Sequence, residues 1–307
     1  MKRTELESWF ERYHVRNVEY NAPLSVHTTW RIGGPADVLV VPDSVEEVRG
    51  ALLVAERLGM PWTVIGRGSN LLVLDGGVRG LVLKMGGRMS DLCVLGTRVV
   101  AQAGRSFVSL ANVAIRNNLR GLEFATGIPG TVGGAVMMDA GAHGGEVRDV
   151  LEWADVITPD GTLHRLSNAD LRFDYRYSIL KDWPAVVISA CFRLEPGNGD
   201  ELKAKVREWS KRRASTQPLS MPNCGSVFRN PPGTFAARLI EAAGLKGLRR
   251  GDAQISEKHA NFIVNLGHAN AEDVLWLMRH AQETVRAKYG ITLETEVRVI
   301  GDPASGR

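Results

Sequence analysis

The chain has 307 residues, of which 44% are hydrophobic and 23% charged, a globular composition with length for two or three domains. Its net charge of +4, from 38 basic and 34 acidic residues, suits anionic small molecules at least as well as nucleic acid. No apolar run approaches the roughly 18 residues of a membrane helix, and the first residues lack the apolar core of a secretory signal. The three cysteines form no CxxC pair, which argues against a disulfide framework. We therefore expect a soluble, cytoplasmic protein.

Three stretches have the apolar spacing and the end signals of helices. The first follows Ser44, with Glu47 three residues on as in a capping box, and stops at Gly59. The second begins at Ser106. The third runs from Asn270 to Gly290, and its spacing predicts one apolar face. That face consists of Val274, Leu277, Met278, Ala281 and Val285.

Strand candidates are short and β-branched, and "WADVITPDGTLHRL" is typical of a hairpin that turns at Asp160 and Gly161. Strands and helices mix without a regular βαβ alternation, so we expect an α+β fold. The linker at residues 195–200 precedes a charged helix, "DELKAKVREWSKRR", and marks a domain boundary. The other strand candidates are "DVLVVP", "WTVIG", "LLVL", "GLVLKM", "RVVAQAG", "AVVISACF", "ANFIVN" and "TLETEVRVIG".

Glycine-rich stretches indicate that main chain without side chains lies close to a ligand or to another part of the protein. "GIPGTVGGAV" at 127–136 and "RIGGPA" at 31–36 would let backbone pass against a flat ligand, and the turn at 66–70 would gather N–H groups around a phosphate. That turn lacks the third glycine and the following helix of the dinucleotide fingerprint. A tight turn or close packing of buried glycines is the alternative explanation. Together the stretches favour an extended, flat, phosphate-bearing cofactor.

Several motifs are absent. We find no Walker A loop, no HExxH and no GxSxG, and the seven histidines show no metal-ligand spacing. No metal is therefore expected.

Eight motifs, in order, resemble the UDP-N-acetylenolpyruvoylglucosamine reductases of bacterial cell-wall synthesis. The resemblance covers roughly Asn21 to Gly301. It implies a two-lobed FAD-binding domain of the p-cresol methylhydroxylase type, with lobes at 1–82 and 83–196, and a C-terminal α+β substrate-binding domain at 197–307. The motifs are "TTWRIGGPADVLVVP", "VIGRGSNLLV", "GLEFATGIPGTVGGAVMMDAGAHG", "YRYSILK", "NCGSVFRNP", "AARLIEAAGLKG", "EKHANFIVN" and "LETEVRVIG".

The resemblance also implies the chemistry. FAD is held non-covalently, NADPH is the hydride donor, and the enolpyruvyl ether of a UDP-sugar is reduced to a lactyl ether, giving UDP-N-acetylmuramate. We expect a monomer or weak oligomer without nucleic-acid or membrane partners. The chain resembles the shorter family form, which lacks an extra substrate loop.

Three residues match the family's catalytic set. Arg176 is expected to grip the substrate carboxylate and stabilise charge that develops there. Ser226 is expected to donate a proton to the carbon next to that carboxylate, and Glu296 to polarise the carboxyl group while sharing a proton with it. Without the resemblance, each residue has an ordinary explanation. Arg176 would form an ion pair, Ser226 would be a turn serine, and Glu296 would be a solvent-facing carboxylate on an alternating strand.

Further contacts follow from the same resemblance. The expected substrate contacts are Tyr175, Arg229, Asn230 and His259. The expected cofactor contacts are Arg31, Gly33, Gly34, Gly66, Arg67, Gly68, Ser69, Asn70, Leu71, Gly127, Ile128, Pro129, Gly130, Gly133, Gly134, Ala135, Gly141 and Ala142.

Some residues depart from the family pattern. Asp139 stands where Asn is usual, and a carboxylate there should point away from the flavin pyrophosphate or be compensated. Arg229 replaces a common Lys and keeps the positive charge. Asp252 stands where a small residue is usual, without a functional implication.

Two other functions compete with the reductase. An oxidase of hydroxy acids or alcohols with the same fold would share the first half of the chain, and only the second half separates the two. A nucleotide-binding or RNA-binding module without chemistry would be colourless, and the aromatic content of 7% without an RNP-like motif speaks against it.

Overall fold

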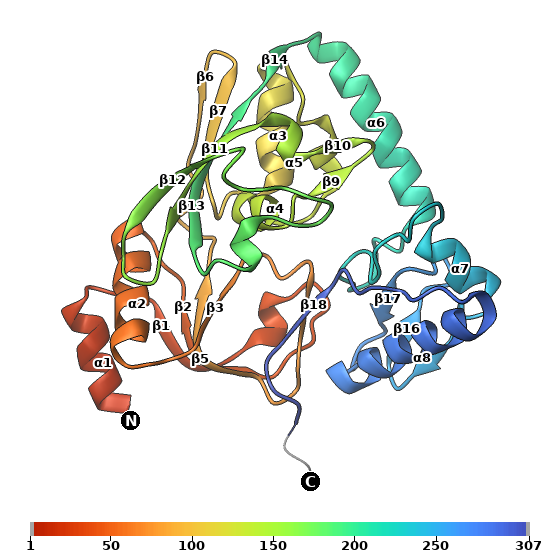
Figure 1. Ribbon diagram of the computed structural model, residues 1–307, viewed down its shortest axis with the longest axis horizontal. Helices are drawn as coiled ribbons and strands as arrows, with labels where there is room; N and C mark the ends of the chain where they lie inside the picture. The colour runs from red at the N-terminus through yellow and green to blue at the C-terminus, as the bar shows by residue number, and fades with distance from the viewer. Residues whose placement is uncertain (1–2, 305–307) are drawn as a thin grey trace. The chain divides into compact units, whose positions relative to one another are not determined.

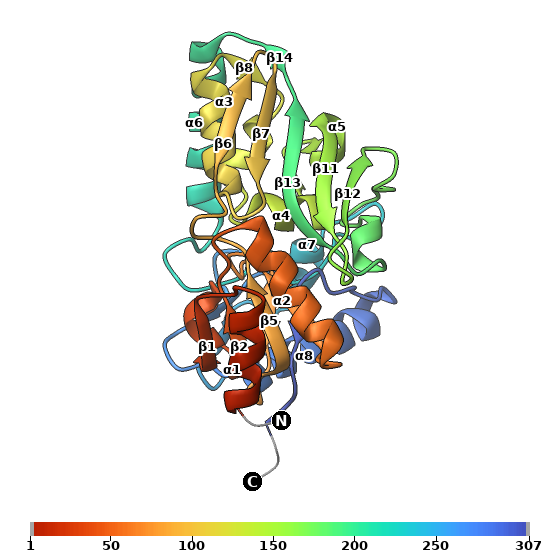
Figure 2. The ribbon, with the colours of Figure 1, turned by 90° about the vertical axis from the view of Figure 1, so that its left-hand side faces the viewer.

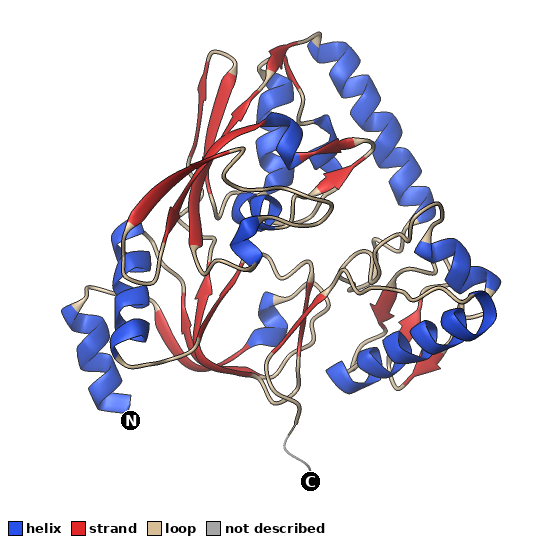
Figure 3. Cartoon of the chain, viewed as in Figure 1, coloured by secondary structure: helices blue, strands red, loops and turns tan. Residues whose placement is uncertain are grey.

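The computed structural model describes residues 3–304, and the chain forms two compact units. The first unit contains the residues up to Tyr20, Val38–Arg67 and Gly80–Lys211; the second contains Asn21–Asp37, Gly68–Arg79 and the residues from Arg212 on. Helices and strands occur in both (Figure 3), as expected for an α+β fold. The expected domain limits near residues 82 and 196 stay a prediction.

An antiparallel five-stranded sheet forms the centre of the first unit. Its order is β12 (Leu163–Ser167), β11 (Leu151–Ile157), β13 (Val186–Arg193), β7 (Arg98–Gln102) and β6 (Leu92–Leu95). The predicted hairpin is its β11–β12 pair, in which Ile157 lies opposite Leu163. Helices α3 (Phe107–Arg116) and α4 (Val132–Met137) lie against one face of this sheet (Figures 1 and 2).

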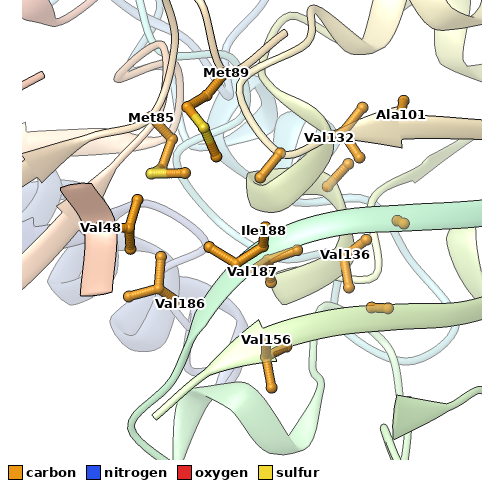
Figure 4. Packing of buried hydrophobic residues seen from close by; sticks show 14 of the residues in the cluster. Val48, Met85, Met89, Ala101, Val132, Val136, Val156, Val186, Val187 and Ile188 are labelled. Atoms are coloured by element: carbon orange, nitrogen blue, oxygen red, sulfur yellow. The ribbon is translucent and has the colours of Figure 1, made fainter. Parts of the chain in front are cut away.

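The core of the first unit joins this sheet to its helices. Val132 and Val136 of α4 belong to the same buried cluster as Val187 and Ile188 of β13 (Figure 4). Val48, on helix α2 (Val45–Arg57), is part of that cluster as well. One continuous core therefore supports the glycine-rich segment that leads into α4.

A second sheet of the first half of the chain has the order β1 (Val18–Pro23), β2 (Pro35–Val40), β5 (Val78–Lys84) and β3 (Trp62–Ile65). β3 and β5 are parallel. Helix α2 begins as predicted, since Ser44 Oγ accepts a hydrogen bond from Glu47 N at 3.2 Å. The Glu47 carboxylate, however, accepts from Asp43 N at 3.0 Å, so the reciprocal half of the capping box is shifted by one residue.

Apart from the elements of the second unit described below, the other elements up to residue 216 are short except for two helices. Helix α1 was not predicted. The charged helix after the linker was predicted and is α6. These elements are α1 (Arg3–Arg12), β8 (Leu119–Arg120), η2 (Glu123–Gly127), β9 (Gly141–Ala142), β10 (Gly145–Glu146), α5 (Val147–Val150), η3 (Ile179–Lys181), β14 (Glu195–Pro196) and α6 (Gly199–Thr216).

The second unit has its own core around the long helix α8 (Ala271–Tyr289). All five residues of its predicted apolar face are buried, and Gly290 ends the helix in the left-handed conformation, with a φ of 69°. Figure 1 shows α8 beside β16 (Ala253–Ile255) and β17 (Ile263–Asn265), which form a three-stranded sheet with β15 (Arg249–Arg250). Trp30 is fully buried in this core and donates from Nε1 to Ile263 O at 2.8 Å. The unit also contains η1 (Leu24–His27), β4 (Leu71–Val73), α7 (Ala236–Ala242) and β18 (Arg298–Ile300).

The predicted strand "TLETEVRVIG" is wrong as a single alternating strand. Only β18 is regular, and it pairs in parallel with β4, whereas Thr295 forms an isolated bridge with Phe228. A single alternating strand would put Thr295 and Val299 on one face with the buried Leu293 and Val297, yet both are exposed. The two halves of the segment pair with different parts of the chain, so one alternation does not extend through both.

The N-terminus of α8 has two side-chain caps. Asn270 Oδ1 accepts from Asp273 N at 2.8 Å, and the Asp75 carboxylate accepts from Ala271 N at 3.0 Å and from Glu272 N at 3.3 Å. Asp75 also places a negative charge at the positive end of the helix dipole.

We expect Asp75→Ala to lower the stability of the folded protein by about 1 kcal/mol, because it removes a cap and a favourable charge. At this size that corresponds to a fall in Tm of roughly 2–4 °C in thermal unfolding. The Tm of Asp75→Asn, which keeps an acceptor oxygen, should lie between the Tm of the unmodified protein and that of Asp75→Ala. A Tm unchanged in Asp75→Ala would show that Asn270 alone caps the helix.

Candidate active site

In the first unit Arg176 is held in one place by backbone carbonyls. Its Nη1 donates to Asp139 O at 3.3 Å and its Nη2 to Gly141 O at 2.9 Å. The guanidinium also lies over the Tyr175 ring, with Cζ 4.9 Å from the centroid. Arg176 has a φ of 57°, uncommon for a residue with a side chain, and Lys181 Nζ donates to its carbonyl at 3.0 Å. Arg176 is thus a well-anchored cation rather than a mobile surface arginine.

Asp139 is fully buried and compensated. Its carboxylate accepts from Arg148 N at 2.9 Å and lies 3.2 Å from Arg148 Nε. Burial nevertheless raises the pKa of Asp139 to about 6, because the cost of desolvating the charge exceeds the effect of Arg148. The expectation that this carboxylate is compensated is confirmed.

In the second unit the backbone brings Ser226 and Glu296 close together. Glu296 N donates to Val227 O at 2.8 Å, and Arg229 N donates to Glu294 O at 2.9 Å. Burial raises the pKa of the Cys224 thiol, and the negative charge of Glu296 raises it further. The segment that carries Ser226 therefore lies beside the segment that carries Glu296.

Asn261, which we did not single out from the sequence, fixes the Ser226 segment. Its Oδ1 accepts from Phe228 N at 2.9 Å, its Nδ2 donates to Phe228 O at 2.8 Å, and its carbonyl accepts from Val227 N at 2.9 Å. The Asn261 side chain is buried and bonds both the backbone N–H and the carbonyl of Phe228, as a neighbouring strand would do. Its position in "EKHANFIVN" was the only signal in the sequence.

Part of the predicted cofactor loop joins the same assembly. Asn70 Nδ2 donates to Glu296 O at 3.1 Å, and Asn70 O accepts from Arg298 N at 3.1 Å. The Gly68 carbonyl accepts from Thr29 N at 3.2 Å, which brings the segment around Arg31 next to the loop. The second unit therefore gathers two predicted catalytic residues and two of the predicted cofactor stretches, and it uses the Asn70 side chain for its own backbone.

The glycine-rich segment of the first unit packs against the chain itself. Val132 N donates to Arg105 O and Gly133 N to Ala103 O, both at 2.9 Å. A Cβ added at Gly66 would overlap the hydroxyl of Thr131, and one added at Gly133 would lie 3.0 Å from Ala103 Cβ. Close packing, the alternative left open by the sequence, therefore explains these two glycines without a ligand. The same holds for Gly33, Gly34, Gly68 and Gly141, where an added Cβ would also meet the chain.

Gly134 is different and fits a ligand. It lies in α4 and is exposed, and the nearest atom to an added Cβ would be Thr131 Oγ1 at an ordinary 3.5 Å. A helical glycine is less favourable than alanine by about 1 kcal/mol, and nothing in the fold requires one here. The residues around α4 thus leave open main chain of the kind that a flat cofactor such as FAD needs.

The predicted substrate residues have structural partners. Asn230 Oδ1 accepts from Ala236 N at 3.2 Å and so caps α7, an unpredicted helix whose N-cap residue, Phe235, makes no capping bond from its side chain. Arg229 Nη1 lies 3.7 Å from the Glu294 carboxylate. Burial lowers the pKa of His259, and its Nδ1 accepts from Asn261 N at 3.3 Å. Their contacts with substrate stay predictions.

Arg176 and Tyr175 belong to the first unit, whereas Ser226 and Glu296 belong to the second. That all three catalytic residues meet around one ligand therefore stays a prediction. Among residues 3–304, no group of three or more His, Cys, Asp or Glu side chains could hold a metal ion.

Across that same range, no helix combines the length and the apolar character required to cross a membrane.

Comparisons with known proteins place this geometry in a class. A family model described as an FAD binding domain matches residues 36–167, and one described as the C-terminal domain of UDP-N-acetylenolpyruvoylglucosamine reductase matches residues 217–300. The fold is that of an FAD-containing oxidoreductase with a C-terminal α+β substrate-binding domain.

The relatives name the family. The UDP-N-acetylenolpyruvoylglucosamine reductase of Pediococcus pentosaceus is 48% identical over 280 residues, covering 91% of this chain and 93% of the relative. That of Bacillus subtilis is 48% identical over 288 residues, covering 94% and 95%. A crystal structure of the reductase from Thermus caldophilus superposes with a TM-score of 0.80 at 39% identity, covering 94% of this chain and 99% of the other.

The chain belongs to the UDP-N-acetylenolpyruvoylglucosamine reductase family. The predicted fold, the FAD cofactor and NADPH as reductant are confirmed. The match over residues 217–300 decides against the competing oxidase, because only that half of the chain separates the two activities.

We expect Gly134→Ala to reduce the flavin bound per protein severalfold while leaving the fold intact. The new methyl group would occupy open space at the main chain, and alanine favours the helix by up to about 1 kcal/mol. The ratio of flavin to protein absorbance and the Tm of the flavin-free protein measure the two effects. Gly86→Ala is the control, since an added Cβ there would meet no atom within 4 Å and so should not disturb the fold. Normal flavin content in Gly134→Ala would remove α4 from the cofactor site.

We expect Asp139→Asn to gain Tm relative to the unmodified protein as pH rises from about 4.5 to 7. The folded-state pKa of about 6 lies above the ordinary 3.8, so the stability that Asp139 contributes is fully present below pH 3.8 and is lost as pH rises through 6. The asparagine has no such loss. Asp252→Asn is the control of opposite sign: hydrogen bonding from His268 N and then Arg249 lowers the pKa of Asp252, so its removal should lower Tm at pH 7. A pH-independent difference for Asp139→Asn would contradict the buried charge.

Proposed function

We propose that Arg176, Ser226 and Glu296 carry out in this chain the reaction of its family. That reaction is the NADPH-dependent reduction of UDP-N-acetylglucosamine enolpyruvate to UDP-N-acetylmuramate in peptidoglycan precursor synthesis. The observation that carries the proposal is the backbone pairing that joins the Ser226 segment to the Glu296 segment. The open main chain around Gly134 of α4 would hold FAD, which when bound would supply the hydride, derived from NADPH, for the terminal carbon of the vinyl group.

Arg176 binds the substrate carboxylate. A guanidinium already held by two carbonyls and by the Tyr175 ring needs little reorganisation to receive an anion, so its charge is available where the reaction adds electron density. The planar fork also orients the carboxylate, which a lysine could not do equally well.

Ser226 supplies the proton. Hydride addition leaves an enolate-like, strongly basic carbon next to the carboxylate, and the Ser226 hydroxyl gives its proton to that carbon. Glu296 holds the carboxyl group of the substrate through a shared proton. Asn261 and the pairing with residues 294–296 keep the serine in a fixed position for this transfer.

We also propose that the protein acts in the cytoplasm as a monomer or weak oligomer, with no nucleic-acid or membrane partner. Support comes from the chemistry of its small-molecule partners, since both NADPH and a UDP-sugar carry charges that a bilayer excludes. The mild net charge of +4 agrees with small anionic partners.

We expect Ser226→Ala to slow turnover by at least about a thousandfold while NADPH still bleaches the flavin absorbance at the normal rate, because only the second half-reaction needs the serine proton. Anaerobic stopped-flow absorbance separates the two half-reactions. Ser220→Ala, an exposed serine of the same unit, is the control. Equal slowing of both half-reactions would show that the variant disturbs the cofactor rather than proton transfer.

A further inference from the structure

We propose that Asp139, Glu146 and Arg148 are positioning residues: together they hold the two carbonyl groups that fix the Arg176 guanidinium in the orientation that binds the substrate carboxylate. This inference rests on the proposed function of Arg176 and goes beyond it, since none of the three residues needs to touch substrate.

The first carbonyl is that of Asp139, which is fixed by its own side chain. Asp139 has a φ of 42°, a left-handed conformation that few residues with side chains adopt. Its buried carboxylate accepts a hydrogen bond from Arg148 N at 2.9 Å and forms an ion pair with Arg148 Nε at 3.2 Å. With the side chain tied to Arg148, the Asp139 carbonyl is held toward Arg176 Nη1.

The second carbonyl is that of Gly141, which is fixed by Glu146. The two residues face each other in the β9–β10 pair, and a Cβ at Gly141 would lie 2.6 Å from Glu146 Cγ. The two segments are therefore packed without a gap, and a shift of Glu146 would move the carbonyl that Arg176 Nη2 binds.

Glu146 also links the two arginines. Its Oε2 accepts from Arg148 Nε at 2.7 Å and from Arg148 Nη2, and its Oε1 lies 3.9 Å from Arg176 Nη1. Its backbone is in turn held by Asp149, whose carboxylate accepts from Glu146 N at 2.8 Å.

The four charged side chains form one cluster of balanced charge, two carboxylates and two guanidiniums. The exposed fraction of these side chains is 0% for Asp139, 16% for Arg176, 23% for Glu146 and 33% for Arg148, so their interactions are poorly screened by water. A neutral partner in place of Glu146 would leave Arg148 and Arg176 to repel one another. The cluster therefore determines where the Arg176 guanidinium lies.

The test is a double-mutant cycle between Glu146→Gln and Arg176→Ala. The NADPH-reduced holoenzyme is mixed anaerobically with the enolpyruvyl UDP-sugar, and the return of flavin absorbance gives the rate of the second half-reaction. We expect a loss of about 10- to 100-fold for Glu146→Gln, the size expected from small misplacement, and a larger loss for Arg176→Ala. The double variant should lose no more than Arg176→Ala alone, because Glu146 acts through Arg176.

A second readout separates positioning from a general loss of structure. The Kd of the UDP-sugar for the oxidised enzyme, from the flavin difference spectrum, should rise in Glu146→Gln and in Arg176→Ala but no further in the double variant. Flavin content and the rate of reduction by NADPH should stay within about twofold. Glu195→Gln, which removes an exposed carboxylate from its pair with Arg120 in the same unit, is the matched control.

The outcomes are distinguishable. Normal rates in Arg176→Ala would refute the function proposed for Arg176. A slow Arg176→Ala with a normal Glu146→Gln, or losses that multiply in the double variant, would overturn the positioning role alone. Arg148→Lys, which keeps the charge but not the fork, is the second variant if Glu146→Gln folds poorly; the same non-additivity with Arg176→Ala is expected, and its absence counts equally against the proposal.

Discussion

The carbonyl groups of Asp139 and Gly141 impose the constraint on which the first unit's share of the site depends. They lie in the glycine-rich segment after α4, where the two-residue strand β9 is the regular element, and buried carbonyls need donors. Arg176 supplies both donors from a distant part of the chain. The loop and the arginine thereby fix one another, which explains why a side chain expected to bind substrate is already so well ordered by the protein.

The elements that were predictable from the sequence are those specified by local chemistry. Ser44 and Asn270 were recognised as caps because a cap and its N–H partner lie three residues apart, and both bonds are present. The segment at 292–301 was predicted wrongly because its partners, Phe228 and β4, are distant in the chain. Buried and exposed residues alternate regularly only along a stretch that pairs with the same neighbouring strands throughout.

The partners of polar side chains in the predicted site were equally hard to predict from the sequence. Asn70 and Asn230 were assigned to ligands from their motifs, yet each bonds a backbone group of the protein: Asn70 bonds the distant Glu296, and Asn230 caps α7 six residues further on. Gly66 and Gly133 likewise have neighbours in the protein that exclude a side chain. A motif identifies which residues build a site, but whether each one faces the ligand or supports the backbone is decided by three-dimensional packing. At Gly134 the packing gives no reason for a glycine, and the cofactor contact expected there stays a prediction.

The two acidic departures from the family pattern have opposite energetics. Asp252 is partly exposed and receives hydrogen bonds from His268 N and Arg249, which lower its pKa, so its charge is favourable where it lies. Asp139 is fully buried, and its raised pKa shows that its charge is unfavourable even with Arg148 beside it. An asparagine could make the neutral hydrogen bond to Arg148 N without that cost. What the carboxylate adds is a second charged contact to Arg148, which in turn binds Glu146. The aspartate therefore lowers the stability of the fold somewhat but holds the loop beside Arg176 more firmly. The buried charge is tolerated because Arg148 is present.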